Sequence, residues 1–469
     1  MKAEQSGGKG WLDKTVLIMG LGIKDGGVNS AKFAVDQGAR VIVTDLSTEK
    51  ILRHSMEALA GLPVEFHLDG HTEQDFLDAD IIIKNPGIKP DHPLLVAARD
   101  NGAVIESPVT LFTDFVKKPY IGITGTKGKS LTTHLTAHLI NYFDPPCIPA
   151  GNNCRSPLRD LQPPQPEFVL ELSSWQLRDL AYKKCSPHIA CWLNFFPDHL
   201  NHYNSLEEYF NDKAAITKFQ TKEDYCVLPW NDTILRDLQT KAEKVYFSPT
   251  EQVPQGCYYK EGQFILKNSS SERVVLQKSD LPDCLQVSHY AANIAAAIML
   301  CQLQLKTEVD FSKAIQDFPG LPHRFESFIT WKNIHCVNDS AATTPESVCL
   351  ALESVQQYPL VVIAGGGGDK NLDYDVMAET LITKAGKLIL FDEDPASKKL
   401  LSNSVVRKFP GLEIVSTMEQ AVAAGFEFLS GKGTLLLSPG CSGAPFFPDL
   451  FVRGENFKKA VLNFTGGNG

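Results

Sequence analysis

The stretch Tyr120-Ile121-Gly122-Ile123-Thr124-Gly125-Thr126-Lys127-Gly128-Lys129-Ser130-Leu131-Thr132-Thr133 decides the fold of the middle of this chain. Its apolar beginning is typical of a buried strand, its glycines of a tight turn, and its end of a helix. Glycines let successive N–H groups face one anion, and the N-terminus of the following helix adds partial positive charge. The stretch therefore predicts a phosphate-binding loop in an α/β fold, formed by Gly125, Thr126, Lys127, Gly128, Lys129, Ser130 and Leu131.

Two side chains of this loop carry chemistry that a nucleoside triphosphate needs. Lys129 supplies a full positive charge to the phosphates, and Ser130 can offer its hydroxyl to Mg²⁺. The usual pattern has a glycine five places before Gly128, where this chain has Ile123, so the loop is a shortened variant. An ordinary strand-to-helix turn is the alternative. Because a strand, a glycine-rich turn and a helix follow one another here, we favour ATP binding over an ordinary turn.

Length, charge and cysteine usage narrow the class of protein. A chain of 469 residues is too long for one hydrophobic core and predicts roughly two to four domains. Its formal net charge of −10 argues against a general nucleic-acid surface. The eleven cysteines include no C-x-x-C pair, and several lie in apolar runs, so we expect reduced core residues in a cytoplasmic protein. Residues 1–10 are polar and no run reaches transmembrane length, so we expect a loose leader and no membrane segment.

The N-terminal region alternates between strands and helices. Residues 15–19 form an apolar strand that ends in a glycine turn, a helix is expected over about residues 29–37, and a second strand ends in Asp45. This order resembles a dinucleotide-binding β-α-β unit. The third glycine of that fingerprint is displaced because residues 24–27 lengthen the loop, and a loose fingerprint indicates NAD only weakly.

The N-terminal region still offers two candidate ligand loops. Gly22 provides a turn for a diphosphate, and Asp45 stands at a strand end where it can bind a ribose or a base edge. A second loop, which contains Gly87, follows the strand over residues 79–83. Tight turns that bind nothing are the alternative interpretation.

Two strands of the middle region end in side chains that bind metals. Residues 168–170 lead into Glu171, and a carboxylate at that point is a common Mg²⁺ ligand in open α/β folds. Residues 189–194 lead toward His199, which would stand near the same metal. A histidine that is only hydrogen-bonded is the alternative.

Lys213 has an unusual position in the helix that begins after Ser205. Residues 205–208 match a capping box. Lys213 falls on the stripe that is expected to be buried. Most such lysines extend to solvent, and the sequence by itself favours that interpretation; a buried lysine would instead have its charged form disfavoured and could react as an amine. The predicted stripe consists of Leu206, Tyr209, Phe210 and Ile216.

The remaining candidates lie toward the C-terminus. Asn293 lies near the start of an alanine-rich helix, where its amide can bind an adenine edge. Residues 318–322 form a Pro/Gly hinge, and a later strand ends in Asn338 and Asp339. A run of four glycines before Asp369 and Lys370 is either a flexible turn or a second anion site. Strands and helices alternate here too, which predicts another parallel sheet.

Together these residues resemble the Mur ligases of peptidoglycan synthesis, over nearly the whole chain. The resemblance implies an α/β protein of three domains: a Rossmann-like one over residues 1–107 for a UDP-sugar, a central P-loop ATPase domain with a mostly parallel sheet over 108–317, and a Rossmann-like amino-acid-binding domain over 318–469. The motifs that carry it are the phosphate loop, Glu171-Leu172-Ser173-Ser174-Trp175-Gln176-Leu177, Gly320-Leu321-Pro322-His323-Arg324-Phe325-Glu326, Asn338-Asp339-Ser340, Ser438-Pro439-Gly440-Cys441 and Arg453-Gly454-Glu455 with Phe457.

The resemblance also implies roles for individual residues. It places ATP at the phosphate loop, a first Mg²⁺ at Ser130 and Glu171, and a second Mg²⁺ at His199 and a carbamylated Lys213. It places the adenine at Asn293, the ATP phosphates and ribose at Arg324 and Asp339, and the muramoyl group at Asn152 and Ser173. It places the UDP at Gly22, Asp45 and Gly87.

For the reaction, the resemblance implies a monomeric cytoplasmic ligase that uses ATP to add glutamate to UDP-N-acetylmuramoyl-L-alanine through an acyl phosphate. Water must be excluded meanwhile, which gives domain closure at the hinge a purpose. The chain departs from the family around the amino acid: a usual lysine after Ser340 is missing, and Gly443 and Leu450 replace a serine and a phenylalanine. Lys370 and Thr343 remain, so we expect glutamate, and the D form over the L form or another amino acid.

Other classes of function stay open at this point. A ligase similar to folylpolyglutamate synthase shares the ATPase design but generally lacks an N-terminal Rossmann-like domain. A non-catalytic nucleotide-binding module would have no need of Glu171, His199 and Lys213, which are all present. An NAD oxidoreductase would leave the phosphate loop without a purpose.

Overall fold

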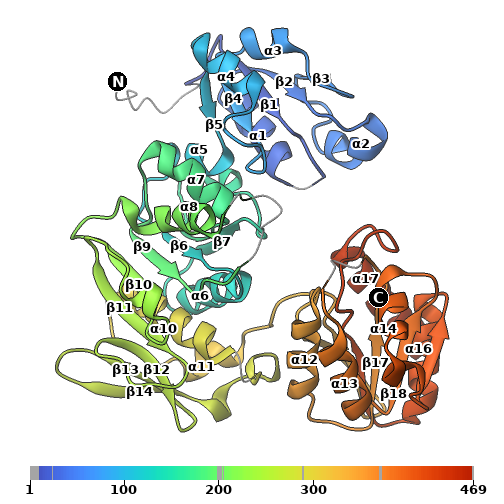
Figure 1. Ribbon diagram of the computed structural model, residues 1–469. Coiled ribbons are helices and arrows are strands. Elements are labelled where there is room, and N and C mark those ends of the chain that lie inside the picture. The colour runs from blue at the N-terminus through green and yellow to red at the C-terminus, as the bar shows by residue number, and fades with distance from the viewer. Residues whose placement is uncertain are drawn as a thin grey trace. The chain divides into compact units, whose positions relative to one another are not determined.

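The computed structural model describes residues 10–23, 25–197, 203, 205–287, 290–368 and 372–466. The chain forms two compact units (Figure 1). The first unit comprises residues 1–277 and 292–314, and the second comprises residues 278–291 and 315–469. The expected leader over residues 1–10 lies, except for Gly10, outside the described residues.

The first unit begins with a five-stranded parallel sheet of order β3-β2-β1-β4-β5, the order of a doubly wound fold, which confirms the Rossmann-like prediction. Its elements are β1 (Thr15–Met19), α1 (Asp25–Asp36), β2 (Arg40–Thr44), α2 (Glu49–Glu57), β3 (Val64–His67), α3 (Glu73–Leu77), β4 (Ile81–Lys84), α4 (Pro93–Asp100) and β5 (Val104–Glu106).

The helix after β1 corrects one expectation from the sequence. We expected residues 24–27 to lengthen the loop, but α1 already begins at Asp25 and contains Gly27. A Cβ atom on Gly27 would lie 2.2 Å from the carbonyl oxygen of Leu21, so only glycine allows the helix to approach the turn this closely. Gly27 therefore has the role that the third glycine of the dinucleotide-binding fingerprint has in other Rossmann-like folds.

The first unit also contains a nine-stranded sheet of order β14-β13-β12-β11-β10-β9-β6-β8-β7. In the part of the sheet that runs from β12 through β6 to β7, neighbouring strands are parallel, as predicted. The strands β12, β13 and β14 form antiparallel hairpins, which we did not predict. The elements are α5 (Pro108–Phe115), β6 (Ile121–Thr124), α6 (Lys129–Phe143), β7 (Cys147–Gly151), η1 (Pro157–Asp160), β8 (Glu167–Glu171), α7 (Ser174–Lys183), β9 (Ile189–Trp192), α8 (Leu206–Lys218), β10 (Tyr225–Pro229), α9 (Thr233–Arg236), β11 (Glu243–Ser248), β12 (Gly256–Lys260), β13 (Gln263–Lys267), β14 (Glu272–Gln277) and nearly all of α10 (Ala291–Leu305). Of the elements that follow β14, η2 (Lys278–Asp280) and η3 (Asp283–Leu285) belong to the second unit, and the division between the units falls within α11 (Ser312–Gln316).

Two ion pairs, the first of them buried, connect the five-stranded sheet to α7. Lys84, at the end of β4, lies 2.8 Å from a carboxylate oxygen of Asp179, and their side chains are 3% and 4% exposed. One helical turn further along α7, Lys183 lies 2.7 Å from Glu106 at the end of β5. The two pairs lie at a cavity of about 450 Å³ whose wall also includes Ser107 and Tyr182.

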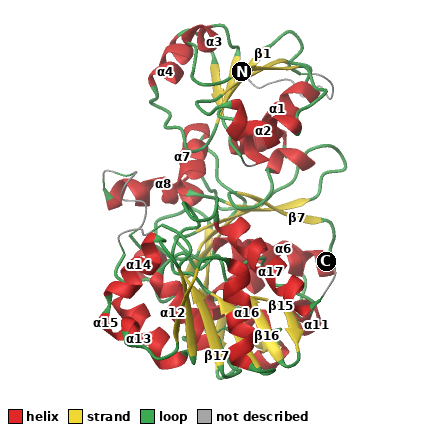
Figure 2. Cartoon of the chain, turned by 90° about the vertical axis from the view of Figure 1, so that its right-hand side faces the viewer, coloured by secondary structure: helices red, strands yellow, loops and turns green. Residues whose placement is uncertain are grey.

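The second unit contains a six-stranded sheet of order β15-β16-β20-β17-β18-β19, which is parallel except for β15. All residues of β17 are buried, since one face packs against α12–α15 and the other against α16 and α17 (Figure 2). The elements are β15 (Glu326–Trp331), β16 (Ile334–Asn338), α12 (Pro345–Ser354), β17 (Leu360–Ala364), α13 (Asp375–Lys384), β18 (Lys387–Phe391), α14 (Pro395–Ser402), α15 (Ser404–Arg407), β19 (Leu412–Val415), α16 (Met418–Leu429), β20 (Gly433–Leu437) and α17 (Leu450–Thr465).

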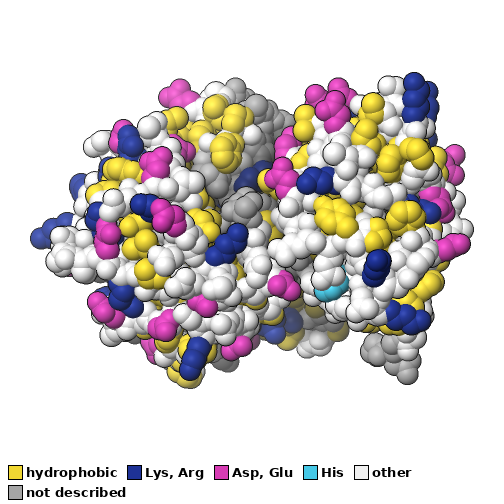
Figure 3. All heavy atoms as spheres, turned by 90° about the horizontal axis from the view of Figure 1, so that it is seen from below, with side chains coloured by type: hydrophobic (Ala, Val, Ile, Leu, Met, Phe, Trp, Pro, Cys, Tyr) yellow, Lys and Arg dark blue, Asp and Glu magenta, His cyan; other side chains and the backbone are white. Residues whose placement is uncertain are grey.

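The cysteines agree in part with the expectation of reduced core residues, since seven are buried and four are half-buried. On the face shown in Figure 3, Lys and Arg side chains are interspersed with Asp and Glu side chains. All eleven cysteines are free thiols. Within the described part of the chain, every helix is too short or too polar to cross a membrane.

Candidate active site

The phosphate loop lies between β6 and α6, where the sequence predicted it. Gly128 immediately precedes α6 with φ of 84°, in the left-handed region that favours glycine. A Cβ atom there would lie 2.3 Å from Nδ2 of Asn293, so the loop also needs glycine for lack of space. The strand partner of Ile123 in β8 is Glu171, which brings the predicted metal ligand beside the start of the loop.

Asn194 holds the loop in shape, and we did not predict this role from the sequence. Its Oδ1 accepts hydrogen bonds from the backbone N–H groups of Thr126 (3.0 Å) and Lys127 (2.9 Å), and its Nδ2 donates to the carbonyl of Lys127. Two successive N–H groups thus converge on one oxygen atom, which is the geometry of an anion-binding nest. The sequence signal for this role was that a polar residue, Asn194, closely follows the apolar strand β9.

Lys213 is buried, with 2% of its surface exposed, so the prediction that it extends to solvent is wrong. Its Nζ donates to the carbonyl of Gly125 (2.9 Å) and to Oγ1 of Thr124 (3.3 Å). The Nζ of Lys129 donates to the same Gly125 carbonyl at 2.9 Å. Two amines therefore meet at the first residue of the phosphate loop.

The stripe that contains Lys213 is buried in part. Tyr209 and Ile216 are buried and Phe210 is half-buried, as expected. Leu206 is 40% exposed, so its placement on the buried face was wrong. It is the first residue of α8 and follows the cap Ser205, whose hydroxyl accepts from the N–H of Glu208.

Glu171 is fully buried, at the last position of β8. Its Oε1 accepts from the amides of Asn152 (3.0 Å) and Asn153 (2.9 Å), and the thiol of Cys154 is 4.0 Å from Oε2. Burial raises the pKa of the Cys154 thiol, and the carboxylate of Glu171 adds to that shift. Within the described residues, these neutral groups are the hydrogen-bond partners of the Glu171 carboxylate, and no cluster of three acidic, histidine or cysteine side chains surrounds it.

Two other predicted ligands of the first unit, Asn293 and Ser173, have structural partners. Nδ2 of Asn293 donates to the Gly128 carbonyl (3.3 Å) and to Oγ1 of Thr132 (3.0 Å), which fixes α10 against the phosphate loop. Ser173 caps α7 and Ser130 lies in the first turn of α6. His199 lies outside the described residues.

The predicted UDP loops gather at the carboxyl edge of the five-stranded sheet. Oδ2 of Asp45 accepts from the N–H of Gly22 (3.0 Å), and its Oδ1 accepts from the N–H of Ser47 (2.8 Å). The N–H of Gly87 donates to Oδ1 of Asn85, and this loop follows β4 directly. The loops after β1, β2 and β4 therefore end at one edge, where ligands bind in such folds.

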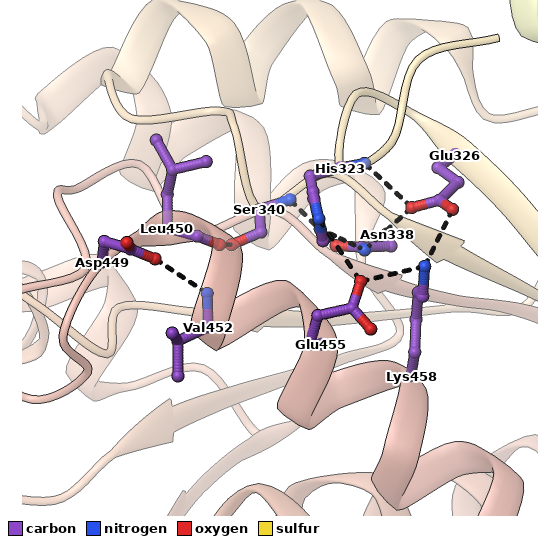
Figure 4. Close-up of polar contacts among 9 residues, drawn as sticks. All are labelled: His323, Glu326, Asn338, Ser340, Asp449, Leu450, Val452, Glu455 and Lys458. Atoms are coloured by element: carbon purple, nitrogen blue, oxygen red, sulfur yellow. Dashed lines mark hydrogen bonds and ion pairs between the residues drawn. The ribbon is translucent and has the colours of Figure 1, made fainter. Parts of the chain in front are cut away.

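In the second unit, Arg324 lies in a tight turn between two residues of left-handed backbone. His323 has φ of 64° and Phe325 has φ of 45°, conformations that cost free energy outside glycine. The Glu326 carboxylate accepts from the N–H of His323 at 2.8 Å (Figure 4). It also accepts from Asn338 (3.0 Å), while Lys458 and Glu455 of α17 complete the group drawn there. The turn is therefore fixed from several sides, and Arg324 is exposed at its centre.

Asp339 follows β16 and is buried. Its Oδ2 accepts from Ser438 (2.9 Å) and its Oδ1 from the N–H of Phe325 (3.1 Å). Burial raises the pKa of Asp339 to about 7, against the lowering effects of Ser438, Phe325 and the charge of Arg324. This carboxyl thus connects the Arg324 turn to the loop after β20.

The predicted amino-acid residues lie in the second unit. A Cβ atom on Gly443 would lie 2.3 Å from the backbone of Asp449, so this position has no room for a side chain and can offer a ligand only its backbone atoms. The preceding residue, Ser442, carries a hydroxyl, and this hydroxyl donates to the carbonyl oxygen of Gly368 (3.1 Å). Leu450 is half-buried and its carbonyl accepts from the Ser340 hydroxyl at 2.7 Å. Thr343 is half-buried, and Lys370 lies outside the described residues.

Three family models match successive parts of the chain. They describe the N-terminal domain of MurD-like Mur ligases (residues 14–107), the Mur ligase middle domain (residues 123–301) and the Mur ligase glutamate ligase domain (residues 323–441). The N-terminal match decides against the folylpolyglutamate-synthase-like and NAD-oxidoreductase alternatives, since it assigns the first sheet to a Mur ligase domain.

Individual proteins match over nearly their full length. The UDP-N-acetylmuramoylalanine–D-glutamate ligase of Roseiflexus sp. (strain RS-1) is 34% identical, over 96% of this chain and 99% of that protein. The protein of the same name from Clostridioides difficile (strain 630) is 32% identical, over 96% and 98%. Among solved structures, the UDP-N-acetylmuramate–alanine ligase of Thermotoga maritima has a TM-score of 0.61 at 19% identity, covering 96% and 99%, which shows the shared fold. This chain belongs to the Mur ligase family.

Proposed function

We propose that this chain is an ATP-dependent ligase that joins D-glutamate to UDP-N-acetylmuramoyl-L-alanine, a step of peptidoglycan synthesis. The observation that carries the proposal is the meeting of Lys129, Lys213 and Glu171 at one end of β6. A phosphate-binding loop, a buried amine and a buried carboxylate are the parts that phosphoryl transfer to a carboxylate needs. The Roseiflexus and Clostridioides relatives are named for this reaction.

The reaction proceeds in two displacements. A carboxylate oxygen of the UDP-sugar attacks the γ-phosphorus of ATP, the bond to the bridging oxygen breaks, and an acyl phosphate and ADP result. Lys129 neutralises charge on the group in transfer. The neutral amine of glutamate then attacks the carbonyl carbon, the amide forms with loss of one proton from nitrogen, and phosphate leaves. Activation is needed because hydroxide is a far poorer leaving group than phosphate.

The residues around Glu171 fit Mg²⁺. The fully buried carboxylate of Glu171, whose described partners are amides and a thiol, offers oxygen atoms of the kind that Mg²⁺ prefers. Ser130 and Glu171 would hold a first Mg²⁺, and His199 with Lys213 as a carbamate would hold a second. Bound Mg²⁺ supplies positive charge for the phosphates.

Lys213 can become a carbamate without a further enzyme. Its neutral amine attacks the carbon of CO₂, a nitrogen–carbon bond forms, and one proton is released to water. Burial beside the phosphate loop imposes a desolvation cost on the charged form of Lys213, and the neutral form is the one that reacts with CO₂. The carbamate then offers oxygen atoms at a point where lysine itself offers N–H groups.

The substrates are divided among three proposed domains. Residues 1–107 bind the UDP-sugar through Gly22, Asp45 and Gly87, residues 108–317 bind ATP, and residues 318–469 bind glutamate. Asn152 and Ser173 would face the muramoyl group, and Asn293, Arg324 and Asp339 would bind ATP. We further propose a cytoplasmic monomer.

The identity of the amino acid is the most specific part of the proposal. Lys370, Thr343 and the backbone at Ser442 and Gly443 would hold its carboxylates, and Leu450 would lie at the same site. Swapping the enantiomer moves the carboxylates relative to the attacking amine, so the site must distinguish them. The glutamate ligase model and the names of the relatives support D-glutamate.

Phosphate release by the purified protein tests the proposal. We expect release with ATP, Mg²⁺, UDP-N-acetylmuramoyl-L-alanine and D-glutamate together, and background rates when any one is omitted. A preference for L-glutamate or for another amino acid would overturn the choice of amino acid. Absence of release with any amino acid would overturn the ligase function.

A further inference from the structure

Arg453 in α17 is one of the largest fully buried side chains of the second unit, with 0% of its surface exposed. A guanidinium group has five N–H donors and cannot lose its charge in a protein. Buried arginines are normally paired with a carboxylate. The partners of Arg453 are of another kind, and they come from three separate loops.

Every N–H of Arg453 has an acceptor, and none of the acceptors is a carboxylate. Nε donates to the hydroxyl of Ser340 (3.0 Å), and Nη2 donates to the carbonyls of Ser340 (2.9 Å) and Cys441 (3.0 Å). Nη1 donates to the carbonyls of Gly366 (3.1 Å) and Ser442 (2.9 Å) and lies 3.5 Å from the sulfur of Cys441. Burial lowers the pKa of Arg453, while Cys441, Asp394 and Asp449 oppose that shift.

These acceptors mark the carboxyl ends of three adjacent parallel strands. Ser340 follows β16, Cys441 follows β20, and Gly366 follows β17, in the sheet order β16-β20-β17. Ligands of such sheets bind just outside this edge. Ser340 is held once more, since its hydroxyl donates to the carbonyl of Leu450 at the start of α17 (Figure 4).

Small residues around Arg453 allow this packing. A Cβ atom on Gly454 would lie 2.1 Å from Nδ1 of His323, and one on Gly443 would lie 2.3 Å from the backbone of Asp449. The helix start, the loop after β20 and the Arg324 turn therefore form one closely packed body around the guanidinium.

We propose that Arg453 is a positioning residue for the incoming amino acid: it gathers the three loops that receive the amino acid and places one positive charge beneath them. The inference rests on the proposed function and extends it. Glutamate brings two carboxylates, and a buried cation with no carboxylate hydrogen-bonded to it attracts anions across several ångströms. Arg453 acts through the loops and makes no contact with the reacting atoms.

Steady-state kinetics of Arg453→Lys test this role, with D-glutamate and ATP varied in turn and the other two substrates saturating. Lysine keeps the charge but cannot reach three loops at once. We expect KM for D-glutamate to rise at least about tenfold and KM for ATP to change less than about threefold. Lys459→Ala, at an exposed cation of the same helix, is the matched control and is expected to leave both constants unchanged.

Chemical rescue separates positioning from general stability. In Arg453→Ala, added methylguanidine can fill the space of the lost side chain, and we expect it to lower KM for D-glutamate back toward the wild-type value. A KM for D-glutamate within about twofold of wild type in Arg453→Lys, or an equal rise in both KM values, overturns the proposal. Failure of both variants to fold with methylguanidine present also overturns it, because the residue would then serve folding alone.

Phosphate release by the wild-type enzyme distinguishes failure of the proposed function from failure of the role assigned to Arg453. If it releases no phosphate with any amino acid, the proposed function fails. If it is active with D-glutamate and the Arg453 variants keep its KM values, the role of Arg453 alone fails.

Discussion

Lys129 and Lys213 donate to the same carbonyl oxygen, that of Gly125, each across 2.9 Å. The two residues come from different helices, α6 and α8. Two like charges this close repel each other, and burial of Lys213 adds a desolvation cost. The proposed conversion of Lys213 to a negative carbamate would replace that repulsion with attraction.

Lys129→Ala is expected to lower kcat by more than about tenfold and to leave the fold intact, because the side chain contributes charge to the phosphoryl transfer and little to the core. Phosphate release measures kcat, and circular dichroism checks the fold. Lys222→Ala, at an exposed turn, is the control with the same loss of charge. Retention of more than about a tenth of the wild-type kcat would contradict the assigned role.

Lys213→Ala is expected to be inactive and to regain part of its activity with acetate, since a small carboxylate can replace the carbamate oxygens at the metal. Mass spectrometry of the wild type in bicarbonate should show the added CO₂. Lys218→Ala, at an exposed position of the same helix, serves as the control. If acetate has no effect and removal of bicarbonate leaves the wild type fully active, Lys213 is unmodified in the working enzyme.

Lys84→Met is expected to destabilise the first unit by about 3–5 kcal/mol, because Asp179 is left as a buried charge without its partner. The double change Lys84→Met/Asp179→Leu should recover most of this loss. Burial lowers the pKa of Lys84 and raises that of Asp179, so each charge depends on the other. Calorimetric melting measures both variants.

An exposed ion pair provides the comparison for Lys84 and Asp179. Arg40 and Glu65 lie 3.0 Å apart with side chains 65% and 49% exposed. Arg40→Met should therefore cost only about 0–1 kcal/mol. Equal effects of Lys84→Met and Arg40→Met would refute the account of the buried pair.

Asp339 is expected to make the second unit less stable as pH rises through about 7. Its folded pKa of about 7 exceeds the ordinary value of 3.8, so the folded state binds the proton more tightly. This contribution is fully present below about pH 4 and is lost toward pH 7, at up to about 1.4 kcal/mol per pH unit. Asp339→Asn should remove that slope.

Melting of the ligand-free wild type and Asp339→Asn between pH 5 and pH 8 measures the effect. The asparagine variant should gain stability relative to the wild type as the pH rises. A difference that stays constant over this range would show that Asp339 titrates below it.

The sequence by itself determined the elements whose signals are local. The phosphate loop, the strand ending in Glu171 and the stripe carrying Lys213 could be predicted because turns, strands and helices each impose a short-range pattern on neighbouring residues. The same patterns predicted parallel sheets in every region. They did not predict the hairpins β12–β14, because short apolar runs suit parallel and antiparallel pairing alike.

Only the tertiary structure decided which of these elements meet. Lys84 pairs with Asp179, Asn194 fixes the phosphate loop, and Arg453 joins loops that follow three strands, across separations of 95, 68 and 113 residues. Such contacts leave no periodic trace, because each partner's local pattern is satisfied whatever side chain lies opposite. The burial of Lys213 was also decided by tertiary contacts. Its position on the helix is compatible with burial or with exposure, and packing against β6 and the phosphate loop buries the amine next to Gly125.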